Sequence, residues 1–316
     1  MTRHLLNRLG QTLIVLFGVS VITFFIMHSA PGHPLQANPE LRLDPTAVER
    51  WLELQELDEP LPAQYLSWLS RVFRGDFGTS LIYNRPLVEL ALERLPATLL
   101  LTVPAFLLAL GLAISCGTWA ALRQGGVADR LLGLVTLAGL SLPSFWLGII
   151  LMMLFSYGYP WLPASGMRTA ENSSVSDILT HLILPVTMLV VGSFSYYVRY
   201  VRYAVLAVLS EDFIRTARAR GFSELYIVFR HVLPNASLPI VTLATLSLPQ
   251  LFTGALIAEY VFSWPGIGRW IVTSTLARDY PVIMAVNLSA AALVAFSNLL
   301  ADLLYLFIDP RLRFKV

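Results

Sequence analysis

Charged side chains are scarce in this sequence. Only 13% of its 316 residues are Asp, Glu, Lys or Arg, whereas 56% are hydrophobic and the mean hydropathy is +0.67. Because an ordinary soluble domain has about 25% charged residues, most of this chain is predicted to contact lipid. Apolar stretches of 18 or more residues recur along the whole sequence, so a cleaved secretory signal cannot explain them.

Lysine and cysteine are nearly absent, and each shortage excludes a class of chemistry. Lys315 is the only lysine and follows Phe314, so the chain has no glycine–lysine loop to bind nucleotide phosphates. Cys116 is the only cysteine, which excludes an internal disulfide, and we interpret it as a small buried apolar side chain. The five histidines are dispersed and no GxSxG or HExxH pattern occurs. We therefore predict no enzyme, no metal site and no cofactor.

Six apolar stretches are near or above the length of about 20 residues that a helix needs to cross a bilayer. They cover residues 9–30, 98–122, 131–157, 178–197, 238–261 and 282–308. The prediction is an all-α integral membrane protein with six transmembrane helices and both termini on one side. Four prolines are predicted to kink the helices that contain them, namely Pro104, Pro143, Pro185 and Pro249.

The arginines predict the orientation of these helices. Arginine is concentrated in the termini and around residues 123–130 and 199–230, whereas the long loop 31–97 is rich in Asp and Glu. Positive charge is retained on the cytoplasmic side of membrane proteins, so both termini are placed in the cytoplasm and the long loop outside it. Part of that loop is predicted to form short amphipathic helices interrupted by Pro60 and Pro62.

The segment 210–234, SEDFIRTARARGFSELYIVFRHVLP, connects the fourth and fifth predicted spans on the cytoplasmic side. Ser210 is predicted to cap a helix with two acidic residues in its first turn, and Gly221 to end that helix in a left-handed conformation. A second helix is predicted from near Ser223 to a point before Pro234. We call this helix–glycine–helix segment the elbow.

Small residues are predicted to leave part of the elbow surface nearly free of side chains. Ala217, Ala219 and Gly221 would let the backbone of a partner approach closely. The alternative, on chemistry alone, is a solvated loop whose basic residues lie among lipid headgroups.

The elbow resembles the EAA motif of the inner-membrane permeases of binding-protein-dependent ABC importers. Arg215, Thr216 and Ala217 occupy the EAA positions, although glutamate is replaced, and Gly221 occupies the glycine of the motif. The dipeptide, oligopeptide and nickel permease branch has the version E-D-[FY]-[VI]-R-T-A-R-A-K-G. Residues 211–221 are similar to it at every position except Arg220.

Other segments resemble the same branch in the same order. They are GDFGTS (75–80), LPAT (95–98), GLSLPSFWLG (139–148), WLPASG (161–166), FSWPGIGR (262–269), RDYPV (278–282) and DLLYLFIDPRLR (302–313). Without the family, the glycine-rich segments indicate only turns at the membrane surface. Glu259 and Asp302 lie close to predicted span ends, so we predict structural roles for both.

The resemblance implies a type I ABC importer permease fold in the inner membrane of a prokaryote. Residues 1–94 would hold the first span and the extracytoplasmic loop, and residues 95–309 the permease domain with the elbow at 210–234. The implied partners are a second related permease, two ATP-binding-cassette subunits that hydrolyse ATP, and an extracytoplasmic solute-binding protein, with no nucleic acid. The residues implied to couple to an ATPase subunit are Glu211, Asp212, Arg215, Thr216, Ala217, Arg218, Ala219 and Gly221.

The resemblance leaves the substrate open. Di- or oligopeptides are the expected cargo, and nickel chelates, glutathione or another small solute are the alternatives. A stand-alone secondary transporter is the competing class, because proline-broken helices also occur there. Such a transporter would purify alone, whereas a permease subunit would purify with ATPase subunits.

The arginine distribution predicts that the C-terminus is cytoplasmic. A phosphatase reporter that is active only outside the cytoplasm, fused after Lys315, should therefore be inactive. The same reporter inserted in the 31–97 loop is the positive control and should be active. Activity of the C-terminal fusion would contradict the six-span topology.

Overall fold

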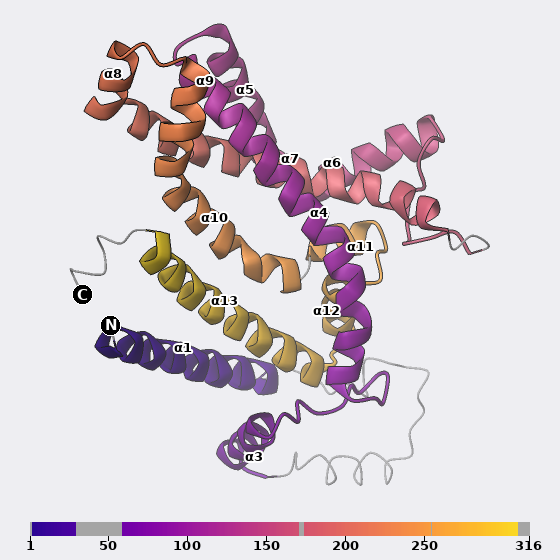
Figure 1. Ribbon diagram of the computed structural model, residues 1–316. Helices are drawn as coiled ribbons and strands as arrows, with labels where there is room; N and C mark the ends of the chain where they lie inside the picture. The colour runs from indigo at the N-terminus through magenta and orange to yellow at the C-terminus, as the bar shows by residue number, and fades with distance from the viewer. Residues whose placement is uncertain (1, 30–58, 171–173, 254, 309–316) are drawn as a thin grey trace.

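Helices form nearly all of the regular structure in this chain (Figure 1). The computed structural model describes residues 2–29, 59–170, 174–253 and 255–308. The long helices are α1 (Thr2–Ser29), α4 (Leu87–Leu122), α7 (Val175–Leu209), α10 (Leu233–Thr253) and α13 (Tyr280–Ile308). The shorter ones are α3 (Leu61–Phe73), α5 (Val127–Ser141), α6 (Ser144–Met152), α8 (Asp212–Ala219), α9 (Glu224–Ile227), α11 (Leu256–Val261) and α12 (Ile267–Leu276).

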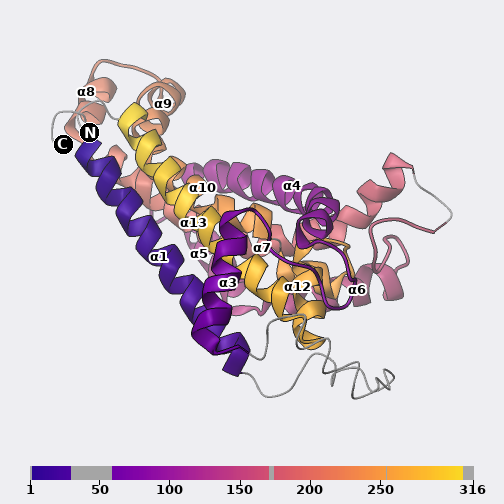
Figure 2. The same ribbon diagram turned by 90° about the horizontal axis from the view of Figure 1, so that it is seen from below.

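The helices account for the predicted membrane crossings. Within the described ranges, five helical segments are long and apolar enough to cross, and a sixth crossing results if α5 and α6 count as one broken span. Each of the six predicted apolar stretches overlaps one of these segments. In both views the start of α1 and the end of α13 lie at the end of the molecule that carries α8 and α9 (Figures 1 and 2).

The longest helices, α4 and α7, pack along each other (Figure 1). Both are longer than their predicted stretches, since α4 begins 11 residues before Thr98 and α7 ends 12 residues after Tyr197. A stripe of small buried residues runs along α4 at every fourth position, at Ala109, Ala113, Gly117 and Ala121. A Cβ atom on Gly117 would lie 3.0 Å from the carbonyl oxygen of Val198. The stripe therefore lets the two helices approach closely, as small residues do in membrane bundles.

The third predicted span is not one continuous helix. It breaks between α5 and α6, which are bent by 96° relative to each other. Leu142, the residue before Pro143, is extended, with φ −82° and ψ 125°. Proline disfavours a helical conformation in the residue before it, so α5 ends there and α6 restarts just after the ring. The predicted kink at Pro143 is thus a complete break.

The fifth predicted span is displaced along the sequence. The crossing segment is Glu224–Pro249, whereas the prediction placed it at 238–261. It also continues through Pro234, so the prediction that the elbow helix stops before this proline is wrong. A π-helical turn at Val228–Val232 directly precedes α10. Because this turn shifts the hydrogen-bonding register, a proline without an N–H can follow it without ending the helix.

The helix α3 begins where the sequence predicted an interruption. Pro60 is its N-cap and Pro62 lies in its first turn, positions where a missing N–H costs nothing. The helix packs on α1, and the hydroxyls of Tyr65 and Ser20 are 2.8 Å apart. The rest of the predicted amphipathic region lies outside the described residues.

A buried carboxyl connects three separate segments of the chain. Glu259 of α11 is fully buried and accepts hydrogen bonds from the Thr98 hydroxyl (3.0 Å) and the Arg269 amide (3.1 Å). Thr98 in turn accepts from the Ile267 amide at 2.8 Å, and the Trp264 indole donates to the Ala97 carbonyl at 2.7 Å. This Glu259 node joins the LPAT and WPGIGR segments.

The buried environment of Glu259 changes the pKa of its carboxyl group. Helix α11 lies outside the candidate spans. Burial raises the pKa of the Glu259 carboxyl, and the hydrogen bonds from the Arg269 amide and the Thr98 hydroxyl act in the opposite direction. The Arg269 guanidinium donates to the Ser263 carbonyl at 2.8 Å. These neutral donors give Glu259 a structural role, although not at a span end as predicted.

A second buried carboxyl joins two more of the sequence segments. Asp279 of the RDYPV segment is fully buried and accepts from the hydroxyl of Ser80 and, at 3.1 Å, from the amide of Leu81. Ser80 ends the GDFGTS segment, where Gly75 and Gly78 have φ of +82° and +90°. The glycines make the turn, as predicted, and Asp279 holds it against the start of α13.

The Glu259 node predicts that Gly268→Ala destabilises the protein. A Cβ atom there would lie 2.6 Å from the Cα of Leu256. Since backbone cannot move aside cheaply, overpacking of this kind should cost about 1–3 kcal/mol and lower the Tm. The control is Gly111→Ala in α4, where an added Cβ meets nothing within 4 Å. Thermal unfolding in detergent measures both, and equal Tm values would contradict the close packing at Gly268.

Candidate functional site

The elbow consists of the short helix α8 and, after the Gly221 turn, helix α9, which continues through the π-helical turn into α10 (Figure 1). Its first helix, α8, starts at Asp212, with Glu211 as N-cap and no capping hydrogen bond from that side chain. The predicted cap, Ser210, instead ends α7, and its hydroxyl donates to the Ala207 carbonyl at 2.7 Å. The prediction was wrong because α7 extends well beyond its apolar stretch.

The turn after α8 depends on Gly221. Its φ is +81°, in the left-handed region where a Cβ atom is unfavourable. The Gly221 amide donates to the Arg218 carbonyl at 2.9 Å and the Phe222 amide to the Ala217 carbonyl at 3.4 Å. This is the Schellman arrangement for ending a helix at glycine. The second helix starts at Glu224, next to Ser223 as predicted, and the Ser223 hydroxyl caps it by accepting from the Tyr226 amide.

The inner face of α8 packs into a continuous hydrophobic cluster. Ile214 is fully buried and Ala217 is 6% exposed. They belong to one cluster with Val205 of α7, Ile227 of α9 and Ile240 of α10. Ala217 therefore faces the inside of the elbow, which corrects the prediction that it forms part of a bare outer surface. Ala219 and Gly221 are exposed.

The remaining predicted coupling residues lie on the outside of the elbow. Exposed side chains belong to Glu211, Asp212, Arg215, Thr216 and Arg218. Arg218 forms a bidentate ion pair with Glu224 at 2.8 and 3.3 Å, which bridges α8 and α9 across the glycine turn. Asp212 and Arg215 are 3.3 Å apart, and exposed pairs of this kind contribute less than about 1 kcal/mol. These charges are available to a partner.

An exposed apolar face on the elbow was missed by the sequence reasoning. Its members lie between the Gly221 turn and the π-helical turn, with exposed fractions between 43% and 71%, and are Phe222, Leu225, Tyr226 and Phe229. The rings of Phe222 and Tyr226 stack at 4.9 Å. Spacings of three and four residues within 222–229 were the available signal. Among the described residues, Leu225, Tyr226 and Phe229 also line an open groove with Arg230.

This arrangement can transmit force between the elbow and the membrane. The cluster that holds Ile214 and Ala217 extends along α7 to Val198 and along α10 to Leu243. Close-packed interiors move as units because side chains leave no room for independent displacement. The inner face of the elbow and these two crossing helices therefore form one packed unit. No His, Cys, Asp or Glu grouping that could hold a metal occurs among the described residues.

Comparisons with known proteins agree with this geometry. Residues 113–314 match the family described as binding-protein-dependent transport system inner membrane component, and residues 1–102 match its N-terminal companion. The oligopeptide transport system permease protein AppB of Bacillus subtilis is 38% identical, covering 99% of this chain and 100% of that protein. The dipeptide transport system permease protein DppB of Escherichia coli K12 is 35% identical over both full lengths.

A solved structure supports the fold. The MetNI methionine ABC transporter contains a chain with a TM-score of 0.53 and 16% identity, covering 70% of this chain and 97% of that one. The helical bundle and its elbow thus define a multi-pass permease subunit with the type I importer fold. The chain belongs to the family of inner membrane components of binding-protein-dependent transport systems.

The burial of Ala217 predicts different outcomes for two neighbouring alanines. Ala217→Glu places a carboxylate in the cluster and should destabilise the protein by at least about 2 kcal/mol, because an unpaired polar group is costly to bury. Ala219→Glu is the control, since that position is exposed. Thermal unfolding of both purified variants makes the comparison. A Tm for Ala217→Glu as high as that of Ala219→Glu would contradict the inward orientation.

Proposed function

We propose that this permease is one of two related membrane subunits in an ATP-binding-cassette importer of short peptides. The observation that carries the proposal is similarity over the full length to permeases named for oligopeptides and dipeptides. A third such relative is the di/tripeptide transport system permease protein DppB of Pseudomonas aeruginosa, 37% identical over 99% of both chains. Nickel chelates and glutathione are the substrates to test against peptides.

The energy source in this proposal is a pair of separate ATPase subunits. Lys315 is the only lysine, so this chain cannot form a glycine–lysine nucleotide loop. ATP-driven work must then enter through a contact with another protein. An extracytoplasmic solute-binding protein would deliver the substrate to the opposite side of the membrane, and the domain 95–309 would form half of the pathway.

The elbow is the proposed contact with an ATPase subunit. Its outer side combines exposed charges at Asp212, Arg215 and Arg218 with exposed apolar side chains at Leu225 and Phe229. Interfaces commonly have an apolar centre within a polar rim. The hydrophobic cluster behind this surface leads into α7 and α10, which supports a role in coupling. Both termini would lie on the same cytoplasmic side.

The proposal predicts that Leu225→Glu abolishes transport without unfolding the chain. Leu225 is 71% exposed, so its replacement disturbs little inside the permease. At an interface centre the carboxylate would be desolvated without a partner, and uptake should fall at least about tenfold. The conservative control is Leu225→Met, which should keep normal uptake. Uptake of a labelled dipeptide into vesicles with the complete assembly and ATP gives the measurement.

Three readouts separate the parts of this prediction. The amount of permease in the membrane should be equal for both variants, and less ATPase subunit should purify with Leu225→Glu. Dipeptide uptake by the wild-type assembly should exceed uptake of glutathione or a nickel chelate. Normal dipeptide uptake by Leu225→Glu would remove the coupling role from this face, and failure of the wild type to take up any peptide would reject the substrate class.

A further inference from the structure

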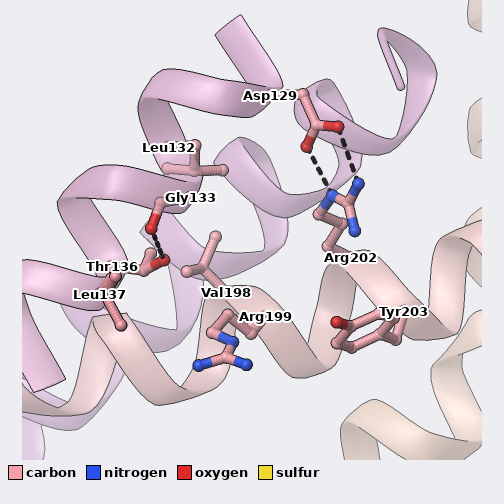
Figure 3. Close-up of a pocket in the computed structure, with 9 residues that line it drawn as sticks. All are labelled: Asp129, Leu132, Gly133, Thr136, Leu137, Val198, Arg199, Arg202 and Tyr203. Carbon is pink, nitrogen blue, oxygen red and sulfur yellow. Dashed lines mark hydrogen bonds and ion pairs between the residues drawn. The ribbon is translucent and has the colours of Figure 1, made fainter. Parts of the chain in front are cut away.

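A groove with an unpaired arginine lies between α5 and α7 (Figure 3). It encloses about 340 Å³. Leu132, Gly133 and Thr136 line it from α5, and Arg199 and Tyr203 from α7. Gly133 has no side chain, and a Cβ atom there would meet nothing within 4 Å. The groove is therefore open at this glycine.

The groove carries a net positive charge. Asp129 and Arg202 neutralise each other through two hydrogen bonds of 2.6 and 2.7 Å. Arg199 is exposed, and its guanidinium lies apart from this pair in Figure 3. Among the described residues it has no ion-pair or hydrogen-bond partner. One guanidinium with all its donors available therefore remains in the groove, whereas the Tyr203 ring lies next to Arg202, 5.8 Å from its guanidinium carbon.

The position of the groove fits the headgroup layer of a membrane. Arg199 comes two residues after Tyr197, the end of the apolar stretch predicted from the sequence, and α7 continues from there to Leu209. Tyr196, Tyr200 and Tyr203 follow one face of α7 and are 55%, 36% and 60% exposed. Tyrosines in membrane helices are enriched at this level because the ring prefers lipid and the hydroxyl prefers water. The neighbouring α5 exposes Leu134, Val135 and Leu137, which a bilayer would cover.

We propose that this groove binds the phosphate of an anionic phospholipid. A guanidinium forms paired hydrogen bonds with phosphate oxygens, and basic pockets between membrane helices bind acidic headgroups. Arg199 would contact the phosphate, and the leucine side chains of α5 would lie against the first part of the acyl chains. The Asp129–Arg202 pair holds α5 against α7 and so maintains the groove. The site does not depend on the transported substrate.

The test uses the complete transporter and two lipids, phosphatidylglycerol and phosphatidylcholine. Native mass spectrometry measures how much of each lipid stays bound during a titration. Arg199→Gln should weaken retention of phosphatidylglycerol about fivefold, the effect of one basic side chain near an anionic headgroup. Gly133→Leu should weaken it by filling the groove while every charge remains. Neither variant should change retention of phosphatidylcholine.

A matched variant controls for the general attraction of positive charge. Arg123→Gln removes a cation just before α5 that does not line the groove, since Arg123 lies over the Trp119 ring at 5.2 Å. It should retain phosphatidylglycerol like the wild type. Equal retention by the wild type and Arg199→Gln would overturn the proposal.

Two further outcomes would contradict the binding of a phospholipid in this groove. Displacement of phosphatidylglycerol by an equal concentration of inorganic phosphate would assign the groove to the free ion. Retention by the isolated chain but not by the complete transporter would assign the groove to a contact between subunits. Arg199 is exposed and unpaired, so the glutamine variant should keep the wild-type Tm and its result should reflect binding.

Discussion

The hydrocarbon layer of a membrane offers no water to the peptide backbone, and this constraint accounts for much of the structure. Long helices satisfy their own amides, so only the breaks need other partners. Buried turns outside the spans have the same need, and at the start of α12 Glu259 and Thr98 accept the amides of Arg269 and Ile267. The Gly166 amide of WLPASG likewise donates to the Phe262 carbonyl at 2.8 Å. Several of the segments that resemble the permease family therefore provide hydrogen-bond partners for backbone groups at the breaks between helices.

The same need for close contact governs the elbow. Its inner side chains continue the packing of α7 and α10, so the two crossing helices and the projecting pair form one hydrophobic cluster. Gly221 ends α8 by adopting a conformation that other residues resist, and the ion pair of Arg218 with Glu224 spans the turn. The elbow can thus present its outer face to a partner while it stays fixed to the membrane helices behind it.

Charge is placed at the ends of the bundle, where it can be hydrated or paired. Arg202 is matched by Asp129, and Arg85 by Glu93, while Arg199 stays free beside a stripe of tyrosines. In a chain with so few charged residues, the pairs fix neighbouring elements, and the free cations are available to headgroups or partner proteins. This division separates structural charges from those that can bind something outside the chain.

The sequence by itself determined the number of apolar crossings, the presence of the elbow with its glycine turn, and the family. These can be predicted from local composition and short motifs. Hydropathy is a property of each apolar segment, and the end of a helix depends on residues within one or two turns of it. The tertiary structure alone decided that Ala217 faces inward, that the helix continues through Pro234, and that Glu259 meets Thr98. Each of these depends on a helix distant in sequence or on a shift in hydrogen-bonding register, and neither can be inferred from residue spacing.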